Sequence, residues 1–402
     1  MSVQPIAASA RRAPRRQPAS LSALWHNKTA RGWIYQVLVV GGVLALGAYL
    51  IGNAQSALAK QGISTGYGFL SQMAGFDIGE SLIAFSSKDT FLRAYGVALL
   101  NTMKISIVSI LVATVIGIAA GVGRMSRNYL VAKLATIYVE VFRNTPQLVQ
   151  LVFWYTLITN LPRPKEALSV FDLAFLSNRG LSLPWLADVQ GGGTVVVALI
   201  AAAIVVTLLR RRERRLRSMG GAKRTVWPLH ALILFGGPPL AAYAAGANVA
   251  FSAPALKGFN FIGGTTVSPE FLALLLGLSL YIGAFIAEIV RSGIQSVGQG
   301  QIEAAKSIGL GSYDTHRKVV FPQALRVIVP PATVQYVSIL KNSSLGVAVG
   351  YPELFSVNNT IATLSGHSVE AITIMMSIYL GMSFLIAALM NLYNRLVQIK
   401  ER

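Results

Sequence analysis

The sequence predicts an all-α polytopic membrane protein with about 8 transmembrane helices. Of its 402 residues, 53% are apolar and only 12% are charged, whereas soluble domains carry roughly twice this share of charged residues. The mean hydropathy is +0.57, which excludes intrinsic disorder over most of the chain. The net charge of +20 would suit a nucleic-acid-binding protein, but such domains are not usually this apolar.

Apolar windows of about 20 residues predict the individual spans, because a helix of that length crosses the hydrocarbon core. Eight windows have approximately this character: 34–51, 95–123, 134–158, 194–209, 228–247, 271–290, 329–350 and 371–392. The third contains Glu140 and Arg143, and the fifth is interrupted by the run Gly236–Pro239.

Charge sidedness predicts that both termini are cytoplasmic. With this orientation the inside segments hold 25 basic and 4 acidic residues, while the outside segments hold 7 basic and 9 acidic residues. Basic residues favour the cytoplasmic side. The first apolar run follows arginine pairs and resembles a signal peptide, but it is longer than an ordinary signal core, so we interpret it as a retained span. The arginine cluster beginning at Arg210 is interpreted as a cytoplasmic loop that fixes topology, with nucleic acid or anionic lipid as alternative partners.

These boundaries divide the chain into membrane and aqueous parts. A basic cytoplasmic tail (1–33) precedes the first span (34–51), and a periplasmic segment (52–94) follows it. The main transmembrane domain is expected over 95–395, with an insertion at 178–269 that carries two extra helices, and a short cytoplasmic tail covers 396–402. A cytoplasmic loop at 291–328 lies within that domain.

Several kinds of chemistry are absent from the sequence. It contains no cysteine and no Gly-Lys-Ser or Gly-Lys-Thr of a phosphate-binding loop. Its four histidines lie far apart, without a partner at ligand spacing. We therefore predict no catalytic site, cofactor or metal on this chain, and any nucleotide hydrolysis would belong to a partner.

The most informative stretch lies in the cytoplasmic loop. Residues from Glu303 to Ile308 favour a helix, Gly309 is typical of a residue that terminates one, and a second short helix is expected over Tyr313–Val320. Pro322 is expected to end that second element. Two short amphipathic helices joined by a glycine suit docking into a groove of a partner, although spacing alone equally allows an ordinary loop.

The same stretch resembles the coupling-loop signature E-A-A-x-x-x-G-x9-I-x-L-P of permease subunits of bacterial ATP-binding-cassette importers. The matching positions are Glu303, Ala304, Ala305, Gly309 and Pro322, with Val319 and Phe321 in place of the usual Ile and Leu. Gly300, just before the signature, is also expected in the coupling loop. Other segments are similar to the polar amino acid (histidine/glutamine permease-like) branch: Asn101–Met103, Tyr138–Gln150, Glu288–Arg291 and Lys341–Leu345. The chain length resembles the general L-amino acid permeases. This resemblance implies a type I importer core of five spans, enlarged by a leading helix and an inserted pair.

Charged residues inside the predicted spans need partners or water, because an unpaired charge in a bilayer costs several kcal/mol. They are Lys104, Glu140, Arg143, Glu288 and Lys341. Glu140 with Arg143, and Glu288 with Arg291, stand at i, i+3 on one helix face, so each pair could close on itself or line a polar path. The candidate path residues are Glu140, Arg143, Thr145, Gln147, Lys341, Asn342 and Ser343. Gly117 and Gly121 are expected to allow close helix packing.

The resemblance implies an amino-acid permease of the bacterial inner membrane that moves L-amino acids from periplasm to cytoplasm. Its implied partners are cytoplasmic ATP-binding subunits, a homologous second permease subunit in a heterodimer, a periplasmic amino-acid-binding protein and the lipid bilayer, without nucleic acid. One alternative is an ion-coupled secondary amino acid transporter. Another is a membrane scaffold whose arginine loop binds nucleic acid.

Overall fold

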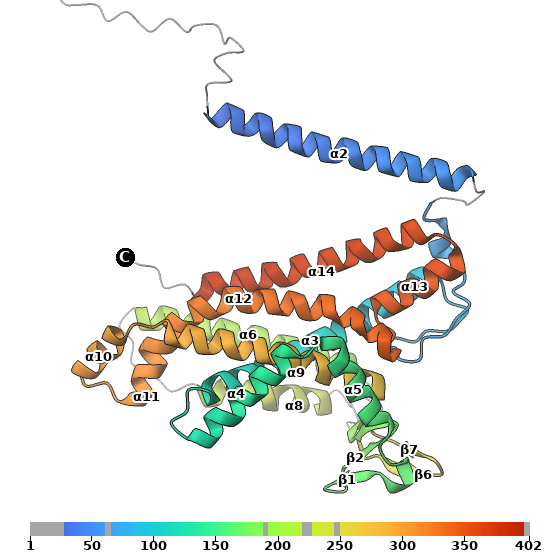
Figure 1. Ribbon diagram of the computed structural model, residues 1–402. Helices are drawn as coiled ribbons and strands as arrows, with labels where there is room; N and C mark the ends of the chain where they lie inside the picture. The colour runs from blue at the N-terminus through green and yellow to red at the C-terminus, as the bar shows by residue number, and fades with distance from the viewer. Residues whose placement is uncertain (1–27, 61–65, 188–191, 219–226, 245–249, 398–402) are drawn as a thin grey trace, which may run out of the picture. The chain divides into compact units, whose positions relative to one another are not determined.

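A computed structural model describes residues 28–60, 66–187, 192–218, 227–244 and 250–397. Most of the predicted N-terminal tail, part of the arginine cluster and most of the C-terminal tail lie outside these residues. The chain forms two units, Met1–Tyr67 and Gly68–Arg402. Helices dominate both, which agrees with the predicted fold class, but short strands occur in the insertion (Figure 1).

The first unit contains one described helix, α2 (Lys28–Lys60). Its Arg31–Asn53 portion is long and apolar enough to cross a membrane, and none of its most apolar window is buried. The helix extends beyond the predicted first span at both ends. Its large apolar side chains, such as Val37 and Leu44, are exposed.

Two long helices form the centre of the second unit: α3 (Phe91–Gly123) and α9 (Pro269–Gln295). Each begins after a hydroxyl residue, since Thr90 Oγ1 accepts the Arg93 N–H and Ser268 Oγ accepts the Phe271 N–H, which satisfies a free donor of the first turn. Both are of membrane-spanning length and composition, as is Ser368–Arg395 of α14 (Ser368–Val397).

Glycines bring α3 and α9 together, as predicted. A Cβ atom at Gly117 would lie 2.5 Å from Ile286 Cγ2, and one at Gly121 would lie 2.6 Å from the Ala287 carbonyl oxygen. The surrounding core contains fully buried Leu274, Leu278, Ile282 and Ile286 from α9. Because these two positions have no side chain, the backbones of α3 and α9 approach closely, as is common between membrane helices.

The predicted third span is two helices, α4 (Tyr129–Asn144) and α5 (Gln147–Thr159), rather than one. The chain turns between them at Thr145 and Pro146, which lacks the N–H that a continuous helix needs. Gln150 Nε2 donates to the carbonyl oxygens of Phe142 (2.9 Å) and Thr145 (3.0 Å). The Gln150 side chain thus supplies a donor to two carbonyl oxygens at the break between the helices.

The predicted seventh span corresponds to α12 (Phe321–Asn342) followed by the 3-10 helix η5 (Ser343–Val349). Pro330 and Pro331 lie inside α12. Gly350 ends η5 with φ of 80°, a conformation that glycine adopts readily. The helix α13 (Leu354–Ser365) then precedes α14.

The insertion contains helices and strands. Helix α6 (Gly192–Ser218) packs with α8 (Gly237–Ala244), which follows α7 (Trp227–Ala231) and the π-helical turn η3 (Leu232–Gly236). The interrupted fifth span is therefore short helical pieces. One sheet has the order β1-β2-β3-β8, and β4 with β5 and β6 with β7 form separate pairs, all antiparallel.

The strands are β1 (Leu168–Val170), β2 (Ala174–Ser177), β3 (Gly180–Leu183), β4 (Trp185–Ala187), β5 (Ala250–Ser252), β6 (Ala255–Lys257), β7 (Asn260–Ile262) and β8 (Thr265–Val267). The prediction of an all-α fold missed them. They gather beyond the end of α5, whereas α10 (Gln299–Ser307) and α11 (Ser312–Thr315) lie at the opposite end of the second unit (Figure 1). Two short 3-10 helices, η1 (Gly68–Ser71) and η2 (Pro164–Glu166), complete the described elements.

Candidate functional site

The predicted cytoplasmic loop folds as two helical pieces around a glycine, as expected. Helix α10 ends at Ser307, and Gly309 follows with φ of 80°. The Gly309 N–H donates to Lys306 O (2.9 Å) and the Leu310 N–H to Ala305 O (3.1 Å). This pair of bonds is the Schellman arrangement that closes a helix end. The predicted helix terminus at Gly309 is confirmed.

The second piece does not end at Pro322, contrary to the sequence prediction. Helix α11 continues through the π-helical turn η4 (His316–Val320) into α12, where Pro322 is in the first turn. In the π-helical turn before it the Phe321 N–H donates to the His316 carbonyl oxygen, so the ladder is already shifted where Pro322 supplies no N–H. The predicted segment is therefore joined directly and rigidly to a long apolar helix.

This stretch, residues 299–322, is called the coupling segment below. Ala305 and Val320 are buried, and Val320 packs with Ala324, Val297 and Ile302. The predicted coupling residues Gly300, Glu303, Ala304, Gly309 and Phe321 are exposed, whereas Val319 and Pro322 are half-buried. One face thus packs on the protein and the other is open.

Two large apolar side chains on that open face were not predicted. Ile308 is 77% exposed and Tyr313 is 73% exposed. They flank Gly309 and Leu310, at the tip between α10 and α11. Exposed apolar side chains in a short, well-ordered turn are typical of a protein contact. Their sequence signal was a pair of apolar residues on either side of a predicted glycine turn.

The candidate path residues come from two places that the fold brings together. Asn342 Nδ2, at the end of α12, donates to Gln147 Oε1, at the start of α5, over 2.7 Å. Thr145 lies at the adjoining break, and its hydroxyl donates to Val141 O (2.8 Å). Lys341 is exposed beside Asn342. Ser343 is an exception, because it is fully buried and bonds to Leu340 O (2.7 Å).

Arg143 reaches another helix instead of closing on Glu140. Its Nη1 lies 3.8 Å from Glu288 Oε2, and its guanidinium lies 5.1 Å from the centroid of the Phe285 ring. Glu140 is exposed and has no ion pair among the described residues. The i, i+3 interpretation is therefore wrong for this pair.

Glu288 receives three arginines, which we call the Glu288 cluster. Arg291 pairs with Oε1, as the spacing predicted, and Arg124 at the end of α3 pairs with Oε2. Arg143 on α4 completes the cluster. One carboxylate thus connects α3, α4 and α9, and α9 leads into the coupling segment a few residues later.

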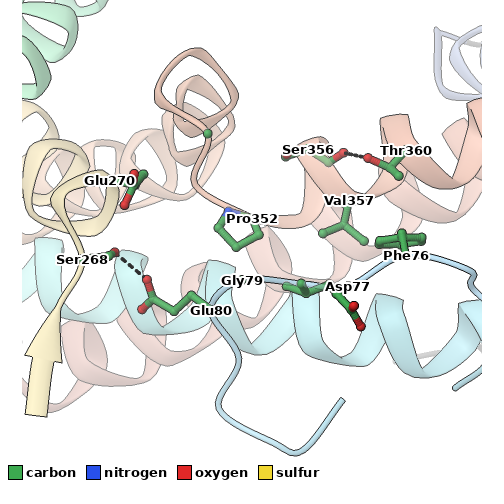
Figure 2. Close-up of a pocket in the computed structure, with 12 residues that line it drawn as sticks. Phe76, Asp77, Gly79, Glu80, Ser268, Glu270, Pro352, Ser356, Val357 and Thr360 are labelled. Atoms are coloured by element: carbon green, nitrogen blue, oxygen red, sulfur yellow. Dashed lines mark hydrogen bonds between the residues drawn. The ribbon is translucent and has the colours of Figure 1, made fainter. Parts of the chain in front are cut away.

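At the other end of the second unit lies a polar cavity of about 410 Å³. Figure 2 shows Glu80 and Ser268 joined by a hydrogen bond on one side and Phe76 with Val357 on another. Its lining residues are Phe76, Asp77, Ile78, Gly79, Glu80, Ser268, Glu270, Gly350, Pro352, Ser356, Val357 and Thr360. Three of them carry carboxylates, and none of the lining residues that the structure describes is basic.

Glu80 supplies the partner that Lys104 needs. Lys104 Nζ lies 2.5 Å from Glu80 Oε1, and Ser268 Oγ donates to Glu80 Oε2 over 2.7 Å. Asn101 Nδ2 also donates to the Glu80 carbonyl oxygen (2.7 Å). The segment before α3 is thereby tied to both α3 and α9. Sequence reasoning missed this contact because Glu80 lies in a segment without helical periodicity.

Glu353 is a fully buried carboxylate near this cavity. It caps α13, accepting the N–H groups of Phe355 (2.8 Å) and Ser356 (2.7 Å), and Tyr379 donates its hydroxyl over 2.8 Å. Burial raises the pKa of Glu353, and these three donors oppose the rise because they favour the anion. The sequence shows Glu353 only as an acidic residue before a helix, and its burial could not be predicted from that.

Comparison with known proteins identifies the relatives of this chain. Residues 251–401 match the family described as "Binding-protein-dependent transport system inner membrane component". An Escherichia coli (strain K12) protein named "Putative amino-acid ABC transporter permease protein YhdX" is 44% identical over 390 residues, covering 96% of this chain and 99% of that protein. The general L-amino acid transport system permease protein AapQ of Rhizobium johnstonii is 40% identical over 385 residues, covering 95% and 96% of the two chains. The glutamate/glutamine/aspartate/asparagine transport system permease protein BztB of Rhodobacter capsulatus is 36% identical over 415 residues, covering 95% and 97%.

Proposed function

This chain belongs to the amino-acid permeases of binding-protein-dependent ABC importers, and we propose that its two described sites are the coupling segment and part of the translocation path. The chain is the inner-membrane, multi-pass permease subunit of an ATP-driven amino-acid importer. It is not itself an enzyme, because ATP hydrolysis belongs to the ATP-binding subunits of such systems. A substrate-binding protein delivers the amino acid.

The observation that carries the coupling proposal is the split character of residues 299–322. Ile302 of α10 packs with Val320 and with Ala324 at the start of α12. On the open side the segment presents Glu303 of α10 and, after the helix ends, Ile308 and Tyr313. Gln323 Nε2 also donates to Gln301 Oε1 (3.4 Å), which connects α10 with α12. A force on the exposed side is therefore passed directly to α12 and, through Ile294 and Val297, to α9.

The proposed mechanism converts that force into alternating access. Closure of the ATP-binding subunits would shift the coupling segment, and α9 and α12 would move with it. The α4–α5 break follows, because Arg143 contacts Glu288 on α9 and Gln147 contacts Asn342 on α12. The ATP-binding subunits must bind the two states with different affinity, since equal affinity shifts nothing.

The proposed path is the polar face made by the α4–α5 break and the end of α12. Glu140 and Lys341 are exposed charges on helices that also expose large apolar side chains, such as Val141 and Val334. Charges on such a surface need water or a polar partner instead of lipid. A path for a zwitterionic amino acid supplies both, with the second wall provided by a homologous second permease subunit.

The proposed topology has eight spans and both termini in the cytoplasm. Supporting it are four described helices of spanning length and three shorter apolar helices: Gln147–Thr159, Val197–Arg210 and Pro228–Ala241. With this topology, 25 of the 35 basic residues lie on the same side of the membrane as the coupling segment, which is the side that basic residues favour. The insertion at 178–269 then contributes the fourth and fifth spans.

Paired glycine substitutions test the coupling proposal. Gly309→Ala places a side chain at φ of 80°, whereas Gly311→Ala, at φ of −66° with open space around it, is the matched control. Copurification with the ATP-binding subunits and ATP-dependent uptake are measured in the reconstituted importer. We expect Glu303→Ala and Gly309→Ala to lose both, while Gly311→Ala retains them. Normal uptake by the Glu303 and Gly309 variants would show that the coupling assignment is wrong.

A further inference from the structure

The insertion contains a second cavity, of about 280 Å³, apart from the sites described above. It lies among the strands and the loop before them, a region we call the strand subdomain (161–187 and 250–267). The lining residues are Arg163, Pro164, Lys165, Glu166, Asn178, Arg179 and Phe259. Three cationic side chains and one carboxylate therefore share one small space.

None of the three cations has a carboxylate within 4.0 Å among the residues that the structure describes. Lys165 Nζ lies 4.6 Å above the Phe259 ring, and Arg179 donates to Asn260 Oδ1. Both contacts orient a cation without neutralising it. Asn178 also lines the cavity, and its Oδ1 is buried without a hydrogen-bond partner among the described residues. With three cations and one carboxylate in its lining, the cavity carries net positive charge, which suits an anionic ligand.

Exposed phenylalanines stand at two hairpin tips of the strand subdomain. Phe171, between β1 and β2, is 93% exposed, and Phe259, between β6 and β7, is 74% exposed. Phe175 and Phe261 stack at 4.7 Å and hold the two hairpins together. Phe171 has φ of 55°, which is costly for a bulky side chain. The turn therefore presents a large apolar group outward at the expense of local strain.

The strand subdomain adjoins the ends of two helices that enter the membrane. Strand β8 ends at Val267, two residues before α9 begins, and the loop at Leu161 follows α5. Figure 1 shows the strands at the end of the second unit opposite α10 and α11. On the proposed topology, the hairpin tips are therefore at the outer boundary of the bilayer.

We propose that the strand subdomain binds the outer leaflet, with the phosphate of a phospholipid headgroup between Arg163, Lys165 and Arg179 and with Phe171 and Phe259 among the acyl chains. Guanidinium and ammonium groups are the usual ligands of phosphate, and aromatic side chains favour the interfacial layer. A free anion would explain the cations but not the exposed phenylalanines. A protein partner would explain the phenylalanines but not three unpaired cations around one cavity. The inference rests on the proposed outward placement of the insertion.

Titration of the purified full-length permease complex with short-chain phosphatidylglycerol tests the headgroup site, with binding followed by native mass spectrometry. Arg163→Gln and Arg179→Gln are each expected to weaken binding about tenfold or more, as for a lost charged hydrogen bond. Arg163→Lys should retain most of the affinity. Lys88→Gln, which removes an exposed charge outside the cavity, should bind like the unmodified chain.

Competition and depth measurements distinguish the sources of the anion. Inorganic phosphate and L-glutamate should displace the lipid only weakly; displacement by either as effective as by the lipid itself would overturn the lipid assignment. Because the chain has no cysteine, Phe171→Cys accepts one fluorophore. In nanodiscs its emission should be quenched by brominated acyl chains and shielded from aqueous iodide.

Iodide access, or shielding that appears only when the substrate-binding protein is added, would contradict the proposal and favour a protein contact. Unchanged affinity in both arginine variants would also contradict it. Amino-acid uptake is not a readout here, so failure of this proposal is distinct from failure of the permease function.

Discussion

Replacing Glu288 by Gln removes the single carboxylate that three arginines share. Arg124 is the least exposed of them, with 16% of its side chain accessible, and Glu288 itself is 25% accessible. Breaking a fully buried ion pair costs about 3–5 kcal/mol, and a hydrogen bond to a charged group contributes about 1.5–3 kcal/mol. Since the cluster is partly accessible, we expect Glu288→Gln to lower the free energy of unfolding by about 2–3 kcal/mol.

The geometry also ranks two of the three arginines, Arg124 and Arg143. Arg124 is in hydrogen-bond contact with Glu288, whereas Arg143 is 3.8 Å away and 38% accessible. Double-mutant cycles should therefore give a coupling of about 1.5–2 kcal/mol between Glu288 and Arg124. The coupling to Arg143 should be below about 1 kcal/mol.

Denaturant unfolding of the purified protein in mild detergent, followed by tryptophan fluorescence, measures these quantities. Lys318→Gln is the control, because its pair with Asp314 is 58% and 43% exposed and should contribute less than about 0.5 kcal/mol. A coupling to Arg143 equal to or larger than that to Arg124 would refute the reasoning.

Other substitutions test the packing of α3 on α9 and the contacts made by Glu80 and Glu353. Gly121→Ala should cost about 1–3 kcal/mol, because the new Cβ would lie 2.6 Å from the Ala287 carbonyl oxygen, whereas Gly96→Ala in the same helix meets nothing within 4 Å and should be tolerated; equal melting temperatures would contradict the close approach. Glu80→Gln should cost about 1.5–3 kcal/mol by leaving Lys104 without its ion-pair partner, and adding Lys104→Met should recover part of that loss in the same unfolding assay, so a purely additive double variant would exclude the pairing. Glu353→Ala should cost about 1–2 kcal/mol through the lost cap of α13, and hydrogen exchange at Phe355 and Ser356 should rise, with unchanged exchange as the contrary result.

Contacts within one helix or one turn were predictable from the sequence. The pairing of Glu288 with Arg291 follows from their spacing, and the turn at Gly309 follows from a glycine after a helix-favouring run. The close approach at Gly117 and Gly121 likewise follows from small residues in an apolar helix. The first two depend on neighbours a few positions apart, whereas for the glycines the sequence indicated only that some helix could approach, not that α9 is the partner.

Contacts between distant segments were not predictable in the same way. Arg124 reaches Glu288 across 164 positions, and Lys104 reaches Glu80 from a different element. Pairing of Arg143 with Glu140 was one of two interpretations, because spacing alone cannot show that another helix offers a carboxylate. Pro322 was predicted to end a helix, but the helix continues past it because the preceding turn is π-helical, a feature that the sequence did not indicate.

The insertion shows a third limit. Its strands are only three or four residues long, too short for alternation to stand out against apolar surroundings. Glycine turns such as those at Gly180 and Gly258 were the available signal.

ATP-dependent uptake of a labelled amino acid into proteoliposomes tests the central claim most directly. The chain would be reconstituted with ATP-binding subunits, a substrate-binding protein and the proposed second permease subunit. Uptake should require ATP, continue when an ionophore abolishes ion gradients, and disappear in the Glu303→Ala variant. Uptake that persists without ATP and collapses with the ionophore would contradict the account and favour ion-coupled secondary transport.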